Sequence, residues 1–211
     1  MYTPTFNKFT FDKMDYRYKH FYKKMWETRG ARFNAHLRLE KEDQRANIAI
    51  TWLSAVLVAV SFIQLSDIAF FSPLKNENAN LFLAALSFAV LIVSLLSQSR
   101  NRQDLANTYL KNGNSISVIY DQFSFCIHQT QPNDDEIQKL ILRYSEIAGE
   151  DGINHEPIDS EYFRACNASD YGLLGFLNAP KRLYIFGKFF LRSGGGYYIA
   201  PLCLFLVFYI I

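Results

Sequence analysis

The chain has 211 residues, of which 50% are hydrophobic and 16% aromatic, and its formal net charge is +2. A charge so close to balance argues against direct nucleic-acid binding, and the length allows one compact domain or a small domain with membrane spans. The three cysteines are widely spaced, and the sequence holds no metal-binding, phosphate-binding or nucleophile motif. We therefore expect no cofactor, no metal site and no enzymatic activity.

Residues 1–45 predict an amphipathic helical region on the cytoplasmic side. They hold 11 of the 22 lysines and arginines, and apolar side chains recur at helical spacing between Met14 and Trp26. Such a helix either lies on anionic lipid headgroups or packs in a cytoplasmic bundle. Gly30 is a candidate break, after which we expect the helix to run directly into the first apolar segment.

Two segments without charged side chains, 46–66 and 78–99, predict a transmembrane hairpin over residues 46–99. As helices they would be about 31 and 33 Å long, which matches the roughly 30 Å hydrocarbon core of a bilayer. Pro73 breaks any continuous helix between them, and two spans joined by so short a link must be antiparallel. The competing interpretation is a hairpin buried inside a soluble protein.

The charged flanks of the two segments predict the orientation of the hairpin. Basic residues lie just before the first segment and just after the second, namely Arg38, Lys41, Arg45, Arg100 and Arg102. The connection between the segments carries a single cation, Lys75. The positive-inside rule therefore places the N-terminus and both flanks in the cytoplasm and the connection outside the cell membrane.

Residues 100–192 predict a cytoplasmic helical region. We expect the second membrane helix to continue over 100–111 and to end at Asn112 and Gly113, because Asn-Gly pairs commonly mark turns. A further amphipathic helix is predicted over 116–127.

The capping residues of the next two helices can also be predicted. Pro132 to Asp134 should break the chain and cap a helix over 137–147, which Gly149 should end. Asp159 is expected to cap a short helix that ends at Cys166.

Residues 193–211 form a C-terminal apolar segment of 19 residues without a charged side chain. Glycines at 194–196 and Pro201 weaken a helix there, so the segment either spans the membrane or lies in its interface or against the hairpin. We favour a third membrane segment. The predicted fold is thus an all-α membrane protein with a transmembrane helical hairpin, cytoplasmic amphipathic helices and a C-terminal apolar membrane segment.

Uncharged polar residues fall on one face of each predicted membrane helix. They are Asn47, Thr51, Ser54 and Ser61 in the first helix and Asn80, Ser87, Ser94 and Ser97 in the second. Polar side chains avoid hydrocarbon, so each face should turn toward protein or water. The two faces either line a pore formed by several copies or pack the hairpin together, and we favour packing.

A polar loop follows the helix over 137–147. Its residues, Glu150 and Asp151 followed by Asn154 to Glu156 and then Asp159, could form a metal or acid–base site. The alternative, which we favour, is that the loop caps the next helix.

A family resemblance rests on a set of residues around the hairpin. The residues that carry it are Trp26, Thr28, Arg29, Arg32, Phe33, Arg38 and Leu39 before the hairpin, Arg100, Arg102, Ala106 and Tyr109 after it, and then Tyr144, Asn154, His155 and Asp159. The arrangement resembles the SLATT family, two-transmembrane effector domains associated with nucleotide-sensing bacterial conflict systems. It is most similar to the branch found beside reverse transcriptases, and it covers roughly Met14 to Tyr162.

The resemblance implies a bacterial antiviral effector in the inner membrane. Such an effector would stay inactive until a partner signals infection, the partner being a nucleotidyltransferase that makes a nucleotide messenger or a reverse transcriptase. It would then form homo-oligomers that perforate the lipid bilayer. The resulting arrest of growth is abortive infection. A non-lytic membrane anchor or scaffold for a cytoplasmic enzyme is the alternative that the sequence leaves open.

Overall fold

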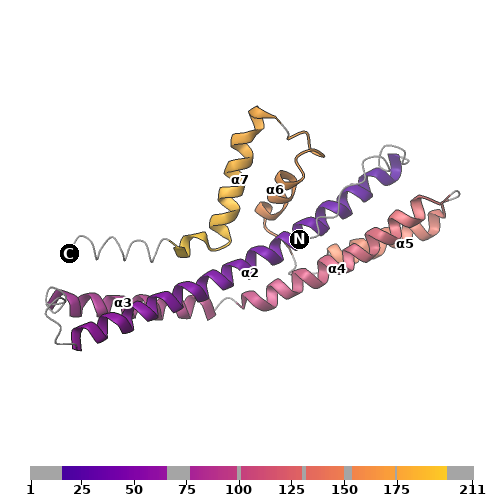
Figure 1. Cartoon of the computed structure of the whole chain (residues 1–211). Helices are drawn as coiled ribbons and strands as arrows, with labels where there is room; N and C mark the ends of the chain where they lie inside the picture. The colour runs from indigo at the N-terminus through magenta and orange to yellow at the C-terminus, as the bar shows by residue number, and fades with distance from the viewer. Residues whose placement is uncertain are drawn as a thin grey trace. The chain divides into compact units, whose positions relative to one another are not determined.

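The computed structural model describes residues 16–65, 77–98, 101–129, 132–149, 154–173 and 175–198. All regular structure in these ranges is helical, as the sequence predicts (Figure 1). The six α-helices among them are α2 (Tyr16–Leu65), α3 (Glu77–Gln98), α4 (Arg102–Ile127), α5 (Asp134–Ala148), α6 (Pro157–Cys166) and α7 (Ala179–Arg192). Two short 3₁₀ helices, η2 (Phe176–Asn178) and η3 (Gly195–Tyr198), flank α7.

The chain divides into two compact units. The core unit takes its described residues from Met1–Leu39 and Gln103–Phe190, and the apolar unit takes its described residues from Glu40–Arg102 and Leu191–Ile211. Helix α2 contributes its first part to the core unit and its second part to the apolar unit.

Helix α2 is continuous for 50 residues and is not interrupted at Gly30. The candidate break was therefore wrong, whereas the direct continuation into the first apolar segment is confirmed. Gly30 faces the ring of Phe163 so closely that a β-carbon at this position would overlap the ring. The glycine allows helix α6 to approach α2, and it does not end a helix.

Helix α4 also passes through a predicted break. It begins at Arg102, after Asn101 with a positive φ of 23°, and continues through Asn112 and Gly113 to Ile127. A β-carbon on Gly113 would lie 3.2 Å from the Phe33 ring. The predicted end at 112–113 was wrong because the glycine provides close packing against α2.

The capping predictions for α5 and α6 agree with the structure more closely. The Asn133 side chain accepts hydrogen bonds from the backbone N–H groups of Asp135 and Glu136, and α5 ends just before Gly149. Helix α6 ends at Cys166 as predicted, although Asp159 lies in its first turn and not at its N-cap, which is Glu156.

The core unit buries the apolar face of the first part of α2 against α4, α5 and α6. Its main cluster of buried side chains comprises Tyr22, Met25, Trp26, Ile116, Ile119, Tyr120, Phe123, Cys126, Ile137, Leu140, Tyr144 and Phe163. The Trp26 ring meets the Phe163 ring edge-on at 4.7 Å between centroids and stacks on Tyr171 at 5.9 Å. Of the two sequence-based alternatives for the N-terminal helix, the described part packs in a bundle.

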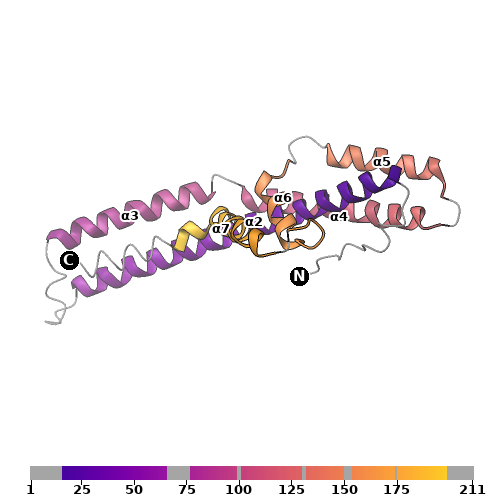
Figure 2. The same cartoon turned by 90° about the horizontal axis from the view of Figure 1, so that it is seen from above.

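The apolar unit contains the second part of α2 and helix α3, which lie side by side in both views (Figures 1 and 2). Helix α3 nearly coincides with the second charge-free segment. Large apolar side chains point away from this pair, including Trp52 (61% exposed), Phe62 (69%) and Phe88 (62%).

Within the described residues, α2 contains the one helical stretch that is long and apolar enough to cross a membrane, while the most apolar part of α3 is a shorter stretch at Leu83–Leu95. Only 22% of the most apolar 18-residue window of α2 is buried. A core helix of a soluble protein can have the same length and composition but is mostly buried. This exposure disfavours the soluble hairpin that the sequence left open. Residues 199–211, which include most of the predicted third membrane segment, lie outside the described residues.

Candidate functional site

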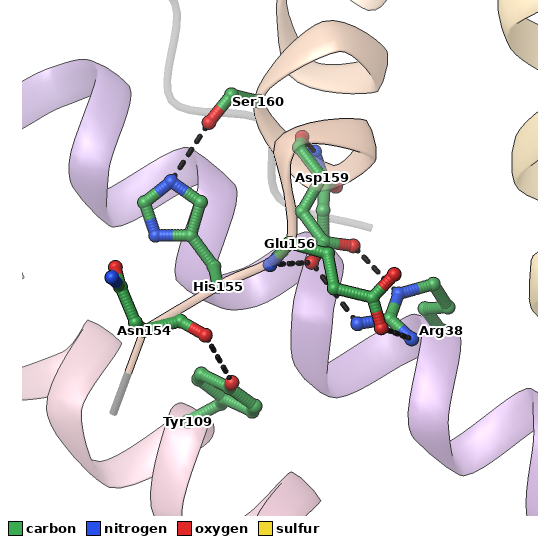
Figure 3. A network of polar contacts seen from close by, with 8 residues as sticks. Arg38, Tyr109, Asn154, His155, Glu156, Asp159 and Ser160 are labelled. Atoms are coloured by element: carbon green, nitrogen blue, oxygen red, sulfur yellow. Dashed lines mark hydrogen bonds and ion pairs between the residues drawn. The ribbon is translucent and has the colours of Figure 1, made fainter. Parts of the chain in front are cut away.

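A buried ion pair links α2 to α6 in the core unit (Figure 3). Arg38 donates from Nε to Asp159 Oδ1 at 2.9 Å and from Nη2 to Asp159 Oδ2 at 3.2 Å. Its Nη1 lies 3.0 Å from Glu156 Oε1, and Asn34 Nδ2 donates to the Asp159 carbonyl at 3.0 Å. The side chains of Arg38 and Asp159 are 4% and 0% exposed. The fork of the guanidinium thus matches one carboxylate, a geometry that lysine cannot provide.

The local sequence of α6 positions the carboxylate of this pair. Pro157 lies at the first helical position, where its missing N–H costs no hydrogen bond. Two residues later, Asp159 Oδ2 accepts a hydrogen bond from the Glu156 backbone N–H at 3.1 Å. Burial raises the pKa of Asp159, and the hydrogen bonds from Arg38 act in the opposite direction. Asp159 therefore caps its own helix and binds α2 at once.

The segment before α6 is held to α4 and to α6 by its own polar groups. Tyr109 Oη donates to the Asn154 carbonyl at 2.9 Å, and His155 Nε2 lies 2.8 Å from Ser160 Oγ (Figure 3). Burial, together with the smaller effect of the positive charge of Arg32, lowers the pKa of His155 to about 4. His155 is therefore neutral at physiological pH.

Further residues that carry the family resemblance lie on the buried side of α2. Thr28 Oγ1 is 2.8 Å from the Tyr144 hydroxyl, and Arg32 Nη2 donates to the Ala148 carbonyl at 3.3 Å. Arg29 lies over the Tyr120 ring at 4.3 Å from its centroid. Burial lowers the pKa of Arg29, against the opposing effect of Tyr120 and Asp121.

A polar layer inside the core unit is thus formed by Thr28, Arg29, Arg32, Arg38, Asn154, His155 and Asp159. Trp26, Arg32 and Arg38 are at most 4% exposed, so they are positioned to hold helices together. In the part of the chain that the structure describes, no group of three or more His, Cys, Asp or Glu side chains could hold a metal ion. Glu150 and Asp151 of the polar loop lie outside that part. Glu156 is the N-cap of α6 and Asp159 lies in its first turn, which is the capping alternative for this loop.

The predicted polar faces of the apolar unit are not brought together as one buried seam. Asn47, Thr51, Asn80 and Ser87 are exposed, and Ser54, Ser61, Ser94 and Ser97 are half-buried. The hydroxyls of Thr51, Ser61 and Ser87 donate to carbonyls of their own helix, four residues back. The buried side of α2 is formed by Ala46, Ala49, Leu53 and Val60, and Leu86 is buried on α3. Whether the polar faces line a pore or pack the hairpin together stays a prediction.

A second polar cluster, which the sequence did not predict, lies at one end of the apolar unit, beside the start of the charge-free segment of α2. We call this end the base of the apolar unit. Arg102 Nε is 3.2 Å from Glu42 Oε1, with the two side chains 3% and 13% exposed. Arg45 Nη1 donates to both the carbonyl and the hydroxyl of Ser193, at 2.8 and 2.7 Å, and Arg102 Nη2 lies 3.4 Å from the Tyr197 hydroxyl. The spacing of Arg38, Glu42 and Arg45 along α2 was the available signal, but it gave no indication of their partners.

These observations define a class of protein: an all-α chain that joins a helical bundle with a buried polar layer to apolar helices whose large side chains face outward. Residues 14–209 match the family described as SMODS and SLOG-associating 2TM effector domain family 5, and the chain belongs to this family. The SLATT resemblance is thereby confirmed, and the match extends well past Tyr162, where the recognised motifs end. The chain is therefore a membrane-associated effector domain of a family that associates with SMODS nucleotidyltransferase and SLOG systems. No curated protein and no solved structure matches the chain.

Proposed function

We propose that this protein is a membrane-perforating effector of a bacterial antiviral defence system. The second part of α2 and helix α3 cross the inner membrane as an antiparallel hairpin, and several copies assemble to breach the bilayer when a partner enzyme is active. The observation that carries the proposal is the outward-facing apolar surface of the apolar unit.

That surface is costly in water and favourable in lipid. Val58, Leu91 and Leu95 are 51%, 55% and 59% exposed, in addition to the aromatic side chains already described. Burying one side chain of this size is worth about 1.5–3 kcal/mol. A row of such residues along two helices therefore favours a surrounding of hydrocarbon.

The polar cluster at the base of the apolar unit supports a membrane boundary at this level. Arg45 and Arg102 flank the charge-free segments, and both make polar contacts there. The basic flanks support a cytoplasmic N-terminus, with the connection near Pro73 outside the cell.

The proposed pore requires more than one copy of the chain. Two helices cannot enclose water, so a pore requires several copies, for which closed symmetry is the usual arrangement. The exposed polar residues Asn47, Thr51 and Ser87 could line such a pore without a charged ring.

The core unit would receive the signal in this proposal. Its buried ion pair fixes α6 on the part of α2 that precedes the membrane segment. The partner is a nucleotidyltransferase that makes a nucleotide messenger, which the family description supports, or a reverse transcriptase, which rests on the resemblance in sequence.

Cysteine labelling in intact cells tests the topology. A cysteine introduced by Asn76→Cys should react with a membrane-impermeant maleimide, whereas Asn114→Cys, at an exposed position of α4, should react only after lysis. Labelling at position 114 but not at position 76 in intact cells would contradict the proposed orientation.

Insertion has a matched test. Leu57→Arg should reduce the membrane yield, because a central arginine costs about 2.5–3.5 kcal/mol, whereas Asn76→Arg should be mild. Equal membrane yields for the two variants would contradict a membrane span at this position. Normal insertion without any membrane damage would favour the scaffold.

A further inference from the structure

Helix α7 carries an apolar stripe on the face that points away from its packing partner. Its buried face holds Ile185 and Phe189, which are 6% and 5% exposed. On the opposite face Leu183, Tyr184 and Leu191 are 73%, 68% and 60% exposed. Tyr184 and Leu191 are seven positions apart and therefore lie one above the other, and Leu183 widens the stripe beside Tyr184. The helix thus has two apolar faces, of which the core unit covers one.

The covered face belongs to a small cluster between α6 and α7. Tyr162 of α6 stacks on Phe189 with 3.8 Å between ring centroids, and Ile158 and Ala165 complete the cluster with Ile185. Because α6 already occupies this face, the stripe is on the side of α7 that α6 leaves uncovered.

The charges of α7 indicate what covers the stripe. The helix contains four basic residues, Lys181, Arg182, Lys188 and Arg192, and no acidic residue. Lys181 and Arg192 are exposed beside the stripe. A helix that combines exposed apolar side chains with cations is suited to the boundary between anionic headgroups and acyl chains.

The end of α7 lies at the level where a membrane would begin. Ser193 follows the last helical residue, and its carbonyl and hydroxyl accept hydrogen bonds from Arg45. Arg45 is the last charged residue before the charge-free segment of α2. The chain then continues from Ser193 with 19 residues that carry no charge.

We propose that α7 lies in the cytoplasmic membrane interface, with the stripe of Leu183, Tyr184 and Leu191 in contact with anionic lipid. This inference rests on the proposed membrane insertion and adds a second, peripheral membrane contact to it. The contact ties α6, and through the Arg38–Asp159 ion pair also α2, to the lipid surface.

Site-specific quenching tests the contact in the full-length protein. Cys166 and Cys203 are replaced by serine, the buried Cys126 is kept, and one cysteine with an environment-sensitive fluorophore is introduced by Leu183→Cys. The protein is reconstituted in vesicles of phosphatidylcholine and phosphatidylglycerol that contain a spin-labelled lipid. Leu142→Cys, an exposed leucine on α5, is the matched control, and Val58→Cys reports the membrane span.

We expect blue-shifted emission and strong lipid quenching at position 183, and neither at position 142. Lys181→Gln with Arg192→Gln, or vesicles of phosphatidylcholine alone, should reduce the quenching at position 183 but not at position 58. Quenching at 183 that does not exceed that at 142, or that is unchanged without anionic lipid, would overturn the inference. So would a label at 183 that is shielded from lipid while it cross-links to a second copy. An unquenched label at position 58 would instead contradict the proposed function itself.

Discussion

Arg38 and Asp159 are 121 residues apart in the sequence, yet their side chains form a two-point hydrogen-bonded ion pair in the core unit. Both side chains are almost completely buried. Asp159 also accepts a hydrogen bond from the Glu156 backbone N–H at the N-terminus of α6. The same carboxylate therefore caps α6 and attaches it to α2. The pair is therefore a buried polar link between α6 and α2.

Arg38→Met should destabilise the core unit by about 3–5 kcal/mol, because it leaves the Asp159 carboxylate buried without its partner. Thermal unfolding of the purified protein in detergent measures this. A Trp52→Phe background leaves Trp26 as the one tryptophan, and Trp26 lies in the core unit.

The Lys188–Glu161 pair is the matched control for Arg38. It is 3.2 Å long, and its side chains are 39% and 43% exposed. Lys188→Met should therefore cost less than about 1 kcal/mol. Similar losses of stability from Arg38→Met and Lys188→Met would show that the buried pair has no special role.

Gly30→Ala should destabilise the protein by about 1–3 kcal/mol, because the added methyl group overlaps the Phe163 ring. Combining it with Phe163→Leu should cost less than the sum of the two single changes, since the smaller side chain makes room. Additive losses would mean that the two residues do not compete for the same space.

Gly187→Ala on α7 is the control for Gly30, because nothing lies within 4 Å of a β-carbon there. It should stabilise the protein by about 0.5–1 kcal/mol through a lower entropy of the unfolded chain. A loss at Gly187 equal to that at Gly30 would show that overlap with the Phe163 ring is not the cause of the loss at Gly30.

The stability of the core unit should fall as the pH decreases from 6.5 toward 4. His155 has a pKa of about 4 in the folded chain against an ordinary value of 6.5. Unfolding therefore takes up a proton in this window, so the contribution of neutral His155 is complete above pH 6.5 and is lost as the pH approaches 4. His155→Gln should flatten the decrease in melting temperature, whereas His128→Gln, at an exposed histidine, should not. Parallel curves for wild type and His155→Gln would contradict this assignment.

Replacing Ser54, Ser61, Ser87 and Ser94 by alanine tests the polar faces. Ser61 and Ser87 donate to carbonyls of their own helices, and interhelical polar contacts in membranes average about 0.6 kcal/mol, so the variant should insert and fold. With normal expression, loss of membrane depolarisation would support a wetted lining. Unchanged depolarisation would indicate that these residues pack the helices together and do not line a pore.

Local patterns in the sequence predicted most of the helices and the caps of α5 and α6, because the responsible residues are neighbours in the chain. Helix α7 was not predicted. Asn133 caps α5 and Gly149 follows its end, and the described parts of the charge-free segments, 46–65 and 78–98, lie inside α2 and α3. Gly30 and Gly113 were misread because the ring that each one faces comes from another helix.

The pairing of distant charges could not be predicted. Arg38, Arg45 and Arg102 were interpreted as flanking cations for orientation, although the structure gives each of them a polar partner. Asp159 and Ser193, two of these partners, lie more than a hundred residues further along the chain than Arg38 and Arg45. No periodicity connects residues at such separations, so only the folded structure reveals which arginines are buried.

The proposed membrane damage is tested most directly by the membrane potential of bacteria that express the protein. A potential-sensitive dye is followed while the wild-type protein is overproduced or its cognate partner is activated, with Leu57→Arg as the insertion-defective control. We expect depolarisation with the wild type, and an intact potential with Leu57→Arg. A wild-type protein that is inserted, with its partner active, and leaves the potential intact would contradict the effector mechanism and favour a membrane scaffold.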